Sequence, residues 1–366
     1  MRVLILSANT GGGHNSAAGA VREAFVQRGI PCEIQDTLSF ISEIHSEVIC
    51  GGHIYLYRYL PKLFGVGYRF EERHPPRFLY EQMAFGAKKL KEYLLQNHFD
   101  AVVSTHIFGS MMLTEARRKY GLTIPHYLVV TDYLVYPGTD MVDVNRYFIG
   151  AEDIKPLYIA DGIQPERLVA SGIPIRSKFL TPPDKAEARR QLHLPEQGPV
   201  VLLVSGSIGC GRFSQVVPAL EQQLPENATL VVICGNNNRL ASRLRRYCSD
   251  RSRIIGFTKR ITDYMAAADM CISKPGGLST TEMLTMGLPM VLMLSVPGCE
   301  THNLKYFIDS GGAVGTDQWP EAIRQCAELV RQPEKLAQMR RRLLTMGYPG
   351  GADVIAHTVI EDYEQN

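Results

Sequence analysis

The sequence predicts an α/β protein with two domains, each built around a parallel sheet. Short, continuous apolar runs that are typical of buried parallel strands alternate with helical segments along most of the chain. Two of these runs, Val3–Leu6 and Pro199–Val204, each lead into a glycine-rich turn and then a helix. A chain of 366 residues is long enough for two domains. We therefore expect two Rossmann-like domains that face each other across a cleft.

The composition is that of a globular protein with ordinary cores. The chain is 45% hydrophobic and 21% charged, and its net charge of +2 gives no reason to expect a nucleic-acid partner. Its eight cysteines form no CxxC pair, which argues against a zinc site or a disulfide framework and favours a reducing compartment. The first apolar run is too short for a signal peptide, and no run approaches the ~20 residues that span a bilayer. We expect a soluble protein, or one attached to a membrane only at its surface.

The first glycine turn is a candidate anion site. Three glycines, Gly11–Gly13, follow the first strand and precede an alanine-rich helix, so backbone N–H groups at the helix start can meet a phosphate. His14 stands at the mouth of this turn, where we expect a catalytic or phosphate-contacting role, with a local cap or turn residue as the alternative. A dinucleotide fingerprint would need glycine in place of Ser16. Asp36, after the next strand, keeps that alternative open.

Residues 55–91 differ in composition from the rest of the chain. They contain eight Lys/Arg, three Glu and nine Tyr/Phe. Aromatic rings interleaved with cations suit an anionic lipid surface, and would also suit nucleic acid. The alternative is an amphipathic helical hairpin whose aromatic side chains are core and whose charges are solvated.

The chain then returns to the α/β pattern. Strands are predicted at Ala101–Val103, Tyr127–Val130 and Arg146–Ile149. His106 and Asp132 follow the first two of these strands, as His14 follows the first strand of the chain. The carboxyl ends of parallel strands share one edge of the sheet, so we expect the three side chains on one rim. Either residue could instead be a turn or cap residue.

A linker is predicted at residues 170–183, after which the pattern restarts. The glycine turn Ser205–Gly211 follows the strand that ends at Val204. Further strands are predicted at residues 230–234, 253–257, 269–273 and 289–293, and helices across 321–366 with breaks at Pro333 and Pro349. The basic runs 239–253 and 340–342 are expected to be solvated helix faces.

A second candidate anion site is the turn Lys274-Pro275-Gly276-Gly277, between a strand and a helix. Its glycines allow a phosphate to approach the helix N-terminus. Glu282 lies about one turn into the helix, where a carboxylate can bind a ribose diol, or where it could be the acid of a capping box. The polar loop Pro297–Asn303 follows the next strand.

These motifs together resemble a known family. The Gly11–His14 turn, Gly172-Ile173-Pro174-Ile175-Arg176, the Lys274–Gly277 turn with Glu282, and Pro297-Gly298-x-Glu300-x-x-Asn303 are similar in order and spacing to monogalactosyldiacylglycerol synthases and bacterial processive diacylglycerol glucosyltransferases. These belong to glycosyltransferase family 28 and have the GT-B fold. The resemblance implies an N-terminal acceptor and membrane domain at 1–172, a UDP-sugar domain at 173–345, and a helix at 346–366 that crosses back to the first domain.

The resemblance also implies an activity. A hexose, glucose or galactose, would pass with inversion from a UDP-sugar to the hydroxyl of diacylglycerol or a related lipid, on the cytoplasmic face of the cell membrane. The anionic membrane surface would be met by residues 55–91, with no nucleic acid as partner. No cofactor or essential metal is expected, because UDP-sugar is a substrate and the sequence shows no convincing acidic metal cluster.

Site residues follow from the same resemblance. The base is expected to be His14 or Asp132, with Gly12, Gly13 and His106 on the acceptor side. Phe257 would hold the uracil, Glu282 the ribose, and Glu300 and Asn303 the donor sugar. The phosphate-side residues would be Ser205, Gly206, Ser207, Gly209, Gly276, Gly277, Ser279 and Thr280.

Three positions depart from the family pattern. Asn9 replaces an Asp of some relatives, the stretch Leu134–Gly138 lacks a histidine that some relatives carry, and Cys299 replaces a Gln beside the sugar-binding loop. The first two leave the base open between His14 and Asp132, and the third leaves the donor sugar open. A lipid-linked N-acetylglucosaminyltransferase, a UDP-N-acetylglucosamine epimerase and a membrane sensor that binds UDP-sugar without turnover stay as alternatives.

Overall fold

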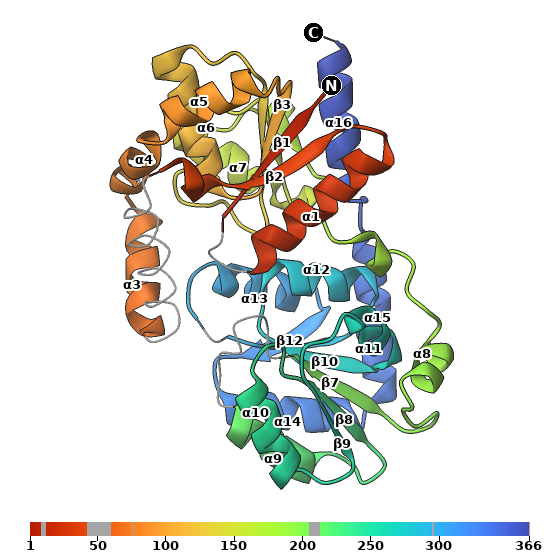
Figure 1. Ribbon diagram of the computed structural model, residues 1–366. Helices are drawn as coiled ribbons and strands as arrows, with labels where there is room; N and C mark the ends of the chain where they lie inside the picture. Colours follow the sequence, from red (N-terminus) through yellow and green to blue (C-terminus); the bar gives the residue numbers. More distant parts are fainter. Residues whose placement is uncertain (9–11, 42–59, 75, 205–212, 295, 366) are drawn as a thin grey trace. The chain divides into compact units, whose positions relative to one another are not determined.

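In the computed structural model the chain forms two α/β units, confirming the predicted fold class (Figure 1). The structure describes residues 1–8, 12–41, 60–74, 76–204, 213–294 and 296–365. Unit 1 comprises Met1–Arg176, Pro297–Cys299 and Pro349–Asn366, and unit 2 comprises Ser177–Val296 and Glu300–Tyr348.

Unit 1 holds a six-stranded parallel sheet in the order β2-β1-β3-β4-β5-β6. Its strands are β1 (Val3–Ser7), β2 (Cys32–Asp36), β3 (Ala101–Ser104), β4 (His126–Val129), β5 (Arg146–Phe148) and β6 (Leu168–Val169). Its helices are α1 (Gly12–Gln27), α3 (Pro61–Glu71), α4 (Arg77–Ala84), α5 (Ala87–Gln96), α6 (Ile107–Tyr120), α7 (Lys155–Ala160) and α16 (Ala352–Glu364).

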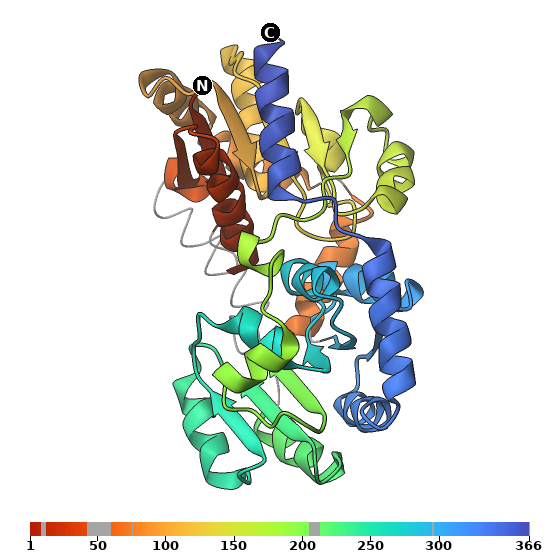
Figure 2. The ribbon, with the colours of Figure 1, turned by 90° about the vertical axis from the view of Figure 1, so that its right-hand side faces the viewer.

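Both faces of this sheet are covered, as continuous apolar strands require. Val3 and Ile5 pack with buried side chains of α1 and α16, and these two helices lie side by side (Figure 2). On the other face, α5 and α4 pack against α6. The short strand β6 was not predicted, because two residues carry no periodic signal.

Unit 2 holds a second six-stranded parallel sheet, in the order β12-β11-β10-β7-β8-β9. Its strands are β7 (Val200–Val204), β8 (Thr229–Ile233), β9 (Ser252–Ile255), β10 (Met270–Ser273), β11 (Met290–Met293) and β12 (Ala313–Thr316). Its helices are α8 (Lys185–Gln191), α9 (Phe213–Gln223), α10 (Asn238–Tyr247), α11 (Ile261–Ala267), α12 (Gly277–Thr285), α13 (Cys299–Asp309, which begins at the end of the unit 1 segment), α14 (Trp319–Leu329) and α15 (Pro333–Met346).

Each sheet has one topological switch point. In unit 1 the strand order reverses between β1 and β3, and in unit 2 between β7 and β10. Chain segments leave the two strands of a switch point in opposite directions, which opens a crevice at their carboxyl ends where α/β proteins bind ligands. The turns containing His14, His106 and Lys274 all follow switch-point strands.

None of the helices in the described part of the chain is both long and apolar enough to cross a membrane. Among the same residues, no three His, Cys, Asp or Glu side chains are grouped as a metal site would require.

One glycine fixes the approach of α6 to the sheet. A Cβ atom on Gly109 would lie 2.5 Å from Oγ of Ser104 and 3.1 Å from Cβ of Leu6, both fully or almost fully buried. The start of α6 can therefore reach the ends of β1 and β3 only with glycine at this position.

We expect Gly109→Ala to destabilise unit 1 by about 1–3 kcal/mol, because overpacking forces strand and helix apart. Urea unfolding measures this free energy. Gly67→Ala is the matched control, since nothing lies within 4 Å of a Cβ at that position and the change should be neutral or slightly stabilising. Equal unfolding free energies for the two variants would contradict the packing argument.

Candidate functional site

His14 is held at the switch point of unit 1 by a residue of the neighbouring strand turn. It is the third residue of α1, and its Nδ1 lies 2.9 Å from the carbonyl oxygen of Thr105, directly after β3. The hydroxyl of Thr105 donates in return to the carbonyl of His14 at 3.2 Å. The ring contact is with another strand turn and not with local backbone, so the alternative that His14 is a local cap is wrong.

The Thr105 contact determines the tautomer of the ring. A carbonyl oxygen can only accept, so the neutral imidazole carries its proton on Nδ1. Nε2 then keeps its lone pair. A half-buried histidine with a lone pair at the rim of the sheet is equipped to accept a proton.

A chain of hydroxyl groups connects His14 to Asp132. Oγ1 of Thr131 lies 3.1 Å from Nδ1 of His14 and 3.1 Å from the hydroxyl of Tyr136. Tyr136 donates in turn to Oδ2 of Asp132 in a short hydrogen bond. The single Nδ1–H is shared between the Thr105 carbonyl and Oγ1 of Thr131, and Thr131 and Tyr136 can each donate onward to the carboxylate, so the chain can stabilise positive charge on the ring.

Burial and charge act on His14 in opposite directions. Desolvation lowers the pKa of His14 below its ordinary value, while the Asp132 carboxylate and the Thr105 carbonyl raise it. Burial also raises the pKa of Tyr136 well above the usual range, helped by the charge of Asp132, so Tyr136 remains a donor. Burial is the larger effect on His14, so the pKa of the ring is lowered and the neutral form is favoured.

His106 packs against His14, and both residues meet on one rim as predicted. The two rings are in edge contact, with centroids 4.5 Å apart. Nδ1 of His106 accepts from the backbone N–H of Phe108 at 3.2 Å, which caps α6. The expected cap role and the expected place beside His14 therefore both hold. Asp36 instead caps a short 3₁₀ helix by accepting from the N–H of Leu38, which explains this acid without a dinucleotide.

Sequence analysis missed Thr105, Thr131 and Tyr136. Thr131 stands beside Asp132 in the sequence, and that adjacency was the one available signal. Tyr136 was noticed only as a place where a histidine is lacking. Its hydroxyl contact depends on how the loop after β4 folds back, which no local pattern shows.

The switch point of unit 2 is formed around the N-terminus of α12. Gly276 is the N-cap and provides no side-chain cap, so the first-turn N–H groups of α12 point out of the helix start. Ser279 is half-buried in this first turn. Thr280 is fully buried, and its hydroxyl donates to the carbonyls of Gly276 and Gly277 at 3.0 Å each. Thr280 therefore supports the turn from inside.

Glu282 is the sixth residue of α12 and is half-buried. A capping-box acid would stand at the third helical position, which is Ser279, so the capping-box alternative is wrong. Of the other predicted donor residues, Phe257 is exposed in the loop after the edge strand β9. Ser205, Gly206, Ser207 and Gly209, after β7, lie outside the described residues.

Glu300 and Asn303 are buried and tied to the turn after β10. Oε1 of Glu300 accepts from Nζ of Lys274 at 2.6 Å, and Nδ2 of Asn303 donates to the carbonyl of Pro275 at 2.9 Å. Both residues of α13 are thus fixed beside the glycine turn that precedes α12.

Two protein-family models match consecutive parts of the chain. The monogalactosyldiacylglycerol (MGDG) synthase model matches residues 14–175, and the glycosyltransferase family 28 C-terminal domain matches residues 200–353. The chain belongs to the glycosyltransferase family that combines these two domains. Its curated relatives include the processive diacylglycerol beta-glucosyltransferase of Bacillus cereus, 28% identical over 99% of this chain and 94% of the relative, and that of Bacillus licheniformis, 26% identical over 99% and 95%.

This glycosyltransferase shares the GT-B fold with several solved structures. MurG of Acinetobacter baumannii has a TM-score of 0.65 at 17% identity, covering 98% of this chain and 99% of MurG. Os79 of O. sativa has a TM-score of 0.67 at 15% identity, covering 99% of this chain and all (100%) of Os79. At these identities the likeness concerns the fold alone.

The hydroxyl chain predicts how His14 titrates. Replacing Asp132 by Asn removes the negative charge that raises the pKa of His14, so the ring should titrate at lower pH than in the wild type. Tyr136→Phe cuts the chain but keeps the carboxylate, and should move the pKa in the same direction by less. An NMR titration of the imidazole C–H resonances measures both.

Tyr147→Phe is the matched control for Tyr136→Phe. It removes a buried hydroxyl that donates to the carbonyl of Val142 at 2.8 Å in the same unit, apart from the chain. A Tyr136→Phe titration that coincides with this control would show that the hydroxyl chain does not act on the ring.

Proposed function

We propose that this glycosyltransferase transfers a hexose, glucose or galactose, from a UDP-sugar to the hydroxyl group of diacylglycerol or a related membrane lipid. The observation that carries the proposal is the imidazole of His14, whose Nδ1 is engaged by Thr105 and whose Nε2 is left to accept a proton at the switch point of unit 1. The names of the full-length relatives, diacylglycerol glucosyltransferases, supply the substrate class.

In the proposed reaction His14 is the general base. Nε2 takes the proton of the lipid hydroxyl as its oxygen attacks the anomeric carbon, and the bond from that carbon to the phosphate oxygen breaks with its electron pair leaving on UDP. Asp132 stabilises the resulting imidazolium through Tyr136 and Thr131. UDP-hexoses are α-linked, so this single displacement gives a β-glycoside, which agrees with the beta in the relatives' names.

Unit 2 is proposed to hold the donor. First-turn N–H groups of α12 meet the diphosphate and take up the charge that develops on leaving UDP, and no metal ion is invoked. In this proposal the carboxylate of Glu282 binds the ribose diol and Phe257 lies beside the uracil. Glu300 and Asn303, which the turn after β10 already holds in place, contact the sugar hydroxyls.

The acceptor would be met at the membrane through α3 and α4. Leu63, Val66 and Phe70 lie on one side of α3, and Phe78 and Phe85 are spaced by seven residues along and just beyond α4, all more than half exposed. The alternative that the aromatic side chains of this region are core is therefore wrong for the three phenylalanines, although Tyr68 is buried.

Exposed cations accompany the apolar side chains of α3 and α4, at Arg69, Arg73 and Arg77. An exposed apolar surface rimmed by cations supports contact with an anionic membrane surface; residues 55–59 of this region lie outside the described part.

The experiment is UDP release from a panel of UDP-sugars, with and without diacylglycerol in anionic vesicles. We expect release that requires diacylglycerol with UDP-glucose or UDP-galactose, and a fall of about 10²–10⁴-fold in turnover for His14→Ala with UDP binding intact. Release without lipid would contradict the acceptor class. Unchanged turnover in His14→Ala would exclude its role as base, and Asp132→Asn would then be the next variant.

Glu282→Ala should weaken UDP binding by about 1–3 kcal/mol, because the ribose hydroxyls lose their acceptor. Isothermal titration calorimetry with UDP measures this change. Glu328→Ala removes an exposed acid of α14 in the same unit and serves as the control. If both variants bind UDP like the wild type, Glu282 does not hold the ribose.

A further inference from the structure

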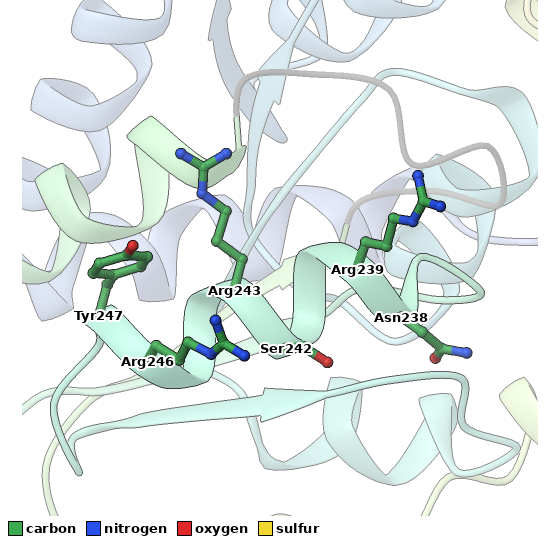
Figure 3. A pocket seen from close by; sticks show the side chains of 6 residues that line it. All are labelled: Asn238, Arg239, Ser242, Arg243, Arg246 and Tyr247. Carbon is green, nitrogen blue, oxygen red and sulfur yellow. The ribbon is translucent and has the colours of Figure 1, made fainter.

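Helix α10 carries a row of arginines along its exposed side. Arg239, Arg243 and Arg246 follow one another at spacings of four and three residues, which places them on one side of the helix. They line a shallow pocket with Asn238, Ser242 and Tyr247, and all six side chains are exposed (Figure 3). Arg239 and Arg243 extend to the same side of α10 in this view.

The helix is fixed so that this row faces outward. Ala241 and Leu244, on its opposite side, belong to the core of unit 2. The side chain of Asn237 caps the helix by accepting from the N–H of Leu240 at 3.0 Å. The fourth arginine, Arg245, is held by the carbonyl of Ile254 at 3.0 and 3.3 Å. The outward direction of the row therefore follows from the packing of the opposite side of α10, from its N-cap and from the contact of Arg245.

Within the described residues, the three outward arginines make no hydrogen bond or ion pair, and α10 contains no acidic residue. Arg324 of α14, by contrast, pairs with Glu321 and Glu328, each one turn away on its own helix. Like charges one turn apart destabilise a helix. The row therefore carries a mutual repulsion that an anionic surface would relieve.

We infer that the face of α10 formed by Arg239, Arg243, Arg246 and Tyr247 docks unit 2 onto an anionic phospholipid surface. The inference rests on the proposed function, because a transferase with a lipid acceptor works at a bilayer. Guanidinium groups bind phosphates, and an exposed tyrosine suits the headgroup layer. Unlike the surface of α3 and α4, this face offers no aliphatic side chain, so its attraction is electrostatic and acts at headgroup depth.

The test compares the partition of the full-length protein onto vesicles of phosphatidylcholine alone and of phosphatidylcholine with phosphatidylglycerol, without donor. Apolar contacts act on both vesicles, so the ratio of the two partition coefficients isolates the electrostatic part. Arg239→Gln/Arg243→Gln/Arg246→Gln should lower that ratio about 100-fold at low salt, about fivefold for each arginine. The wild-type ratio should approach that of the variant at 1 M salt, where charges are screened within about 3 Å.

Two matched variants separate charge from structure. The triple Arg→Lys variant at the same positions keeps the charge and should keep most of the ratio. Arg190→Gln/Lys335→Gln/Arg341→Gln removes the same charge from exposed sites elsewhere in unit 2 and should change the ratio far less. A Gln triple variant equal to this control, or a Lys variant that falls as far as the Gln variant, overturns the inference. Loss of binding to an RNA oligonucleotide with an unchanged vesicle ratio also overturns it, in favour of a nucleic-acid partner.

The proposed function is tested separately from the docking surface. With diacylglycerol in neutral detergent micelles no anionic surface is present, and the Gln triple variant should release UDP at the wild-type rate. A wild-type protein that releases no UDP there contradicts the proposed function while the vesicle ratio still decides the role of α10. A variant that loses activity in micelles contradicts the inference that α10 acts only through the membrane.

Discussion

Parallel pairing of the strands at the two switch points determines where the chemistry of this protein can lie. β1 pairs in parallel with both β2 and β3, so Leu6 is level with Gln35 on one side and with Ser104 on the other. The chain therefore leaves β1 and β3 at the same height. His14 and Thr105 meet there, and a change of register by one residue would separate them.

The connection between His14 and Asp132 moderates the charge that the ring experiences. A carboxylate in direct contact with an imidazole strongly favours the protonated ring. Here two neutral hydroxyls stand between them, so burial outweighs the carboxylate and the pKa of the ring stays below its ordinary value. The same chain can still deliver stabilisation once a proton arrives, because each hydroxyl donates toward the carboxylate. An arrangement of this kind suits a group that must first be a base and then tolerate being a cation.

The sequence predicted the fold class correctly because continuous apolar runs and glycine turns carry a strong local signal. It missed β12, whose four residues Ala313–Thr316 include a glycine and lie at a sheet edge. It placed His14, His106 and Asp132 on one rim from topology alone. The hydroxyl groups that join two of them could not be found, because hydrogen bonds between loops follow from the folded backbone. The side on which Phe70, Phe78 and Phe85 are exposed was equally a matter of tertiary packing.

Helix α16 makes the completion of unit 1 depend on the last part of the chain to be synthesised. Val359 and Ile355 complete the core that α1 and the first sheet begin, and the N–H of Gly351 bonds to the carbonyl of Ser171. All of unit 2 lies between those partners in the chain, together with the short unit 1 segment Pro297–Cys299. The ribosome thus has to finish synthesising unit 2 before α16 is available to cover the apolar surface of α1. During that interval unit 2 can fold as a unit, while unit 1 waits with an open face on which chaperones can act.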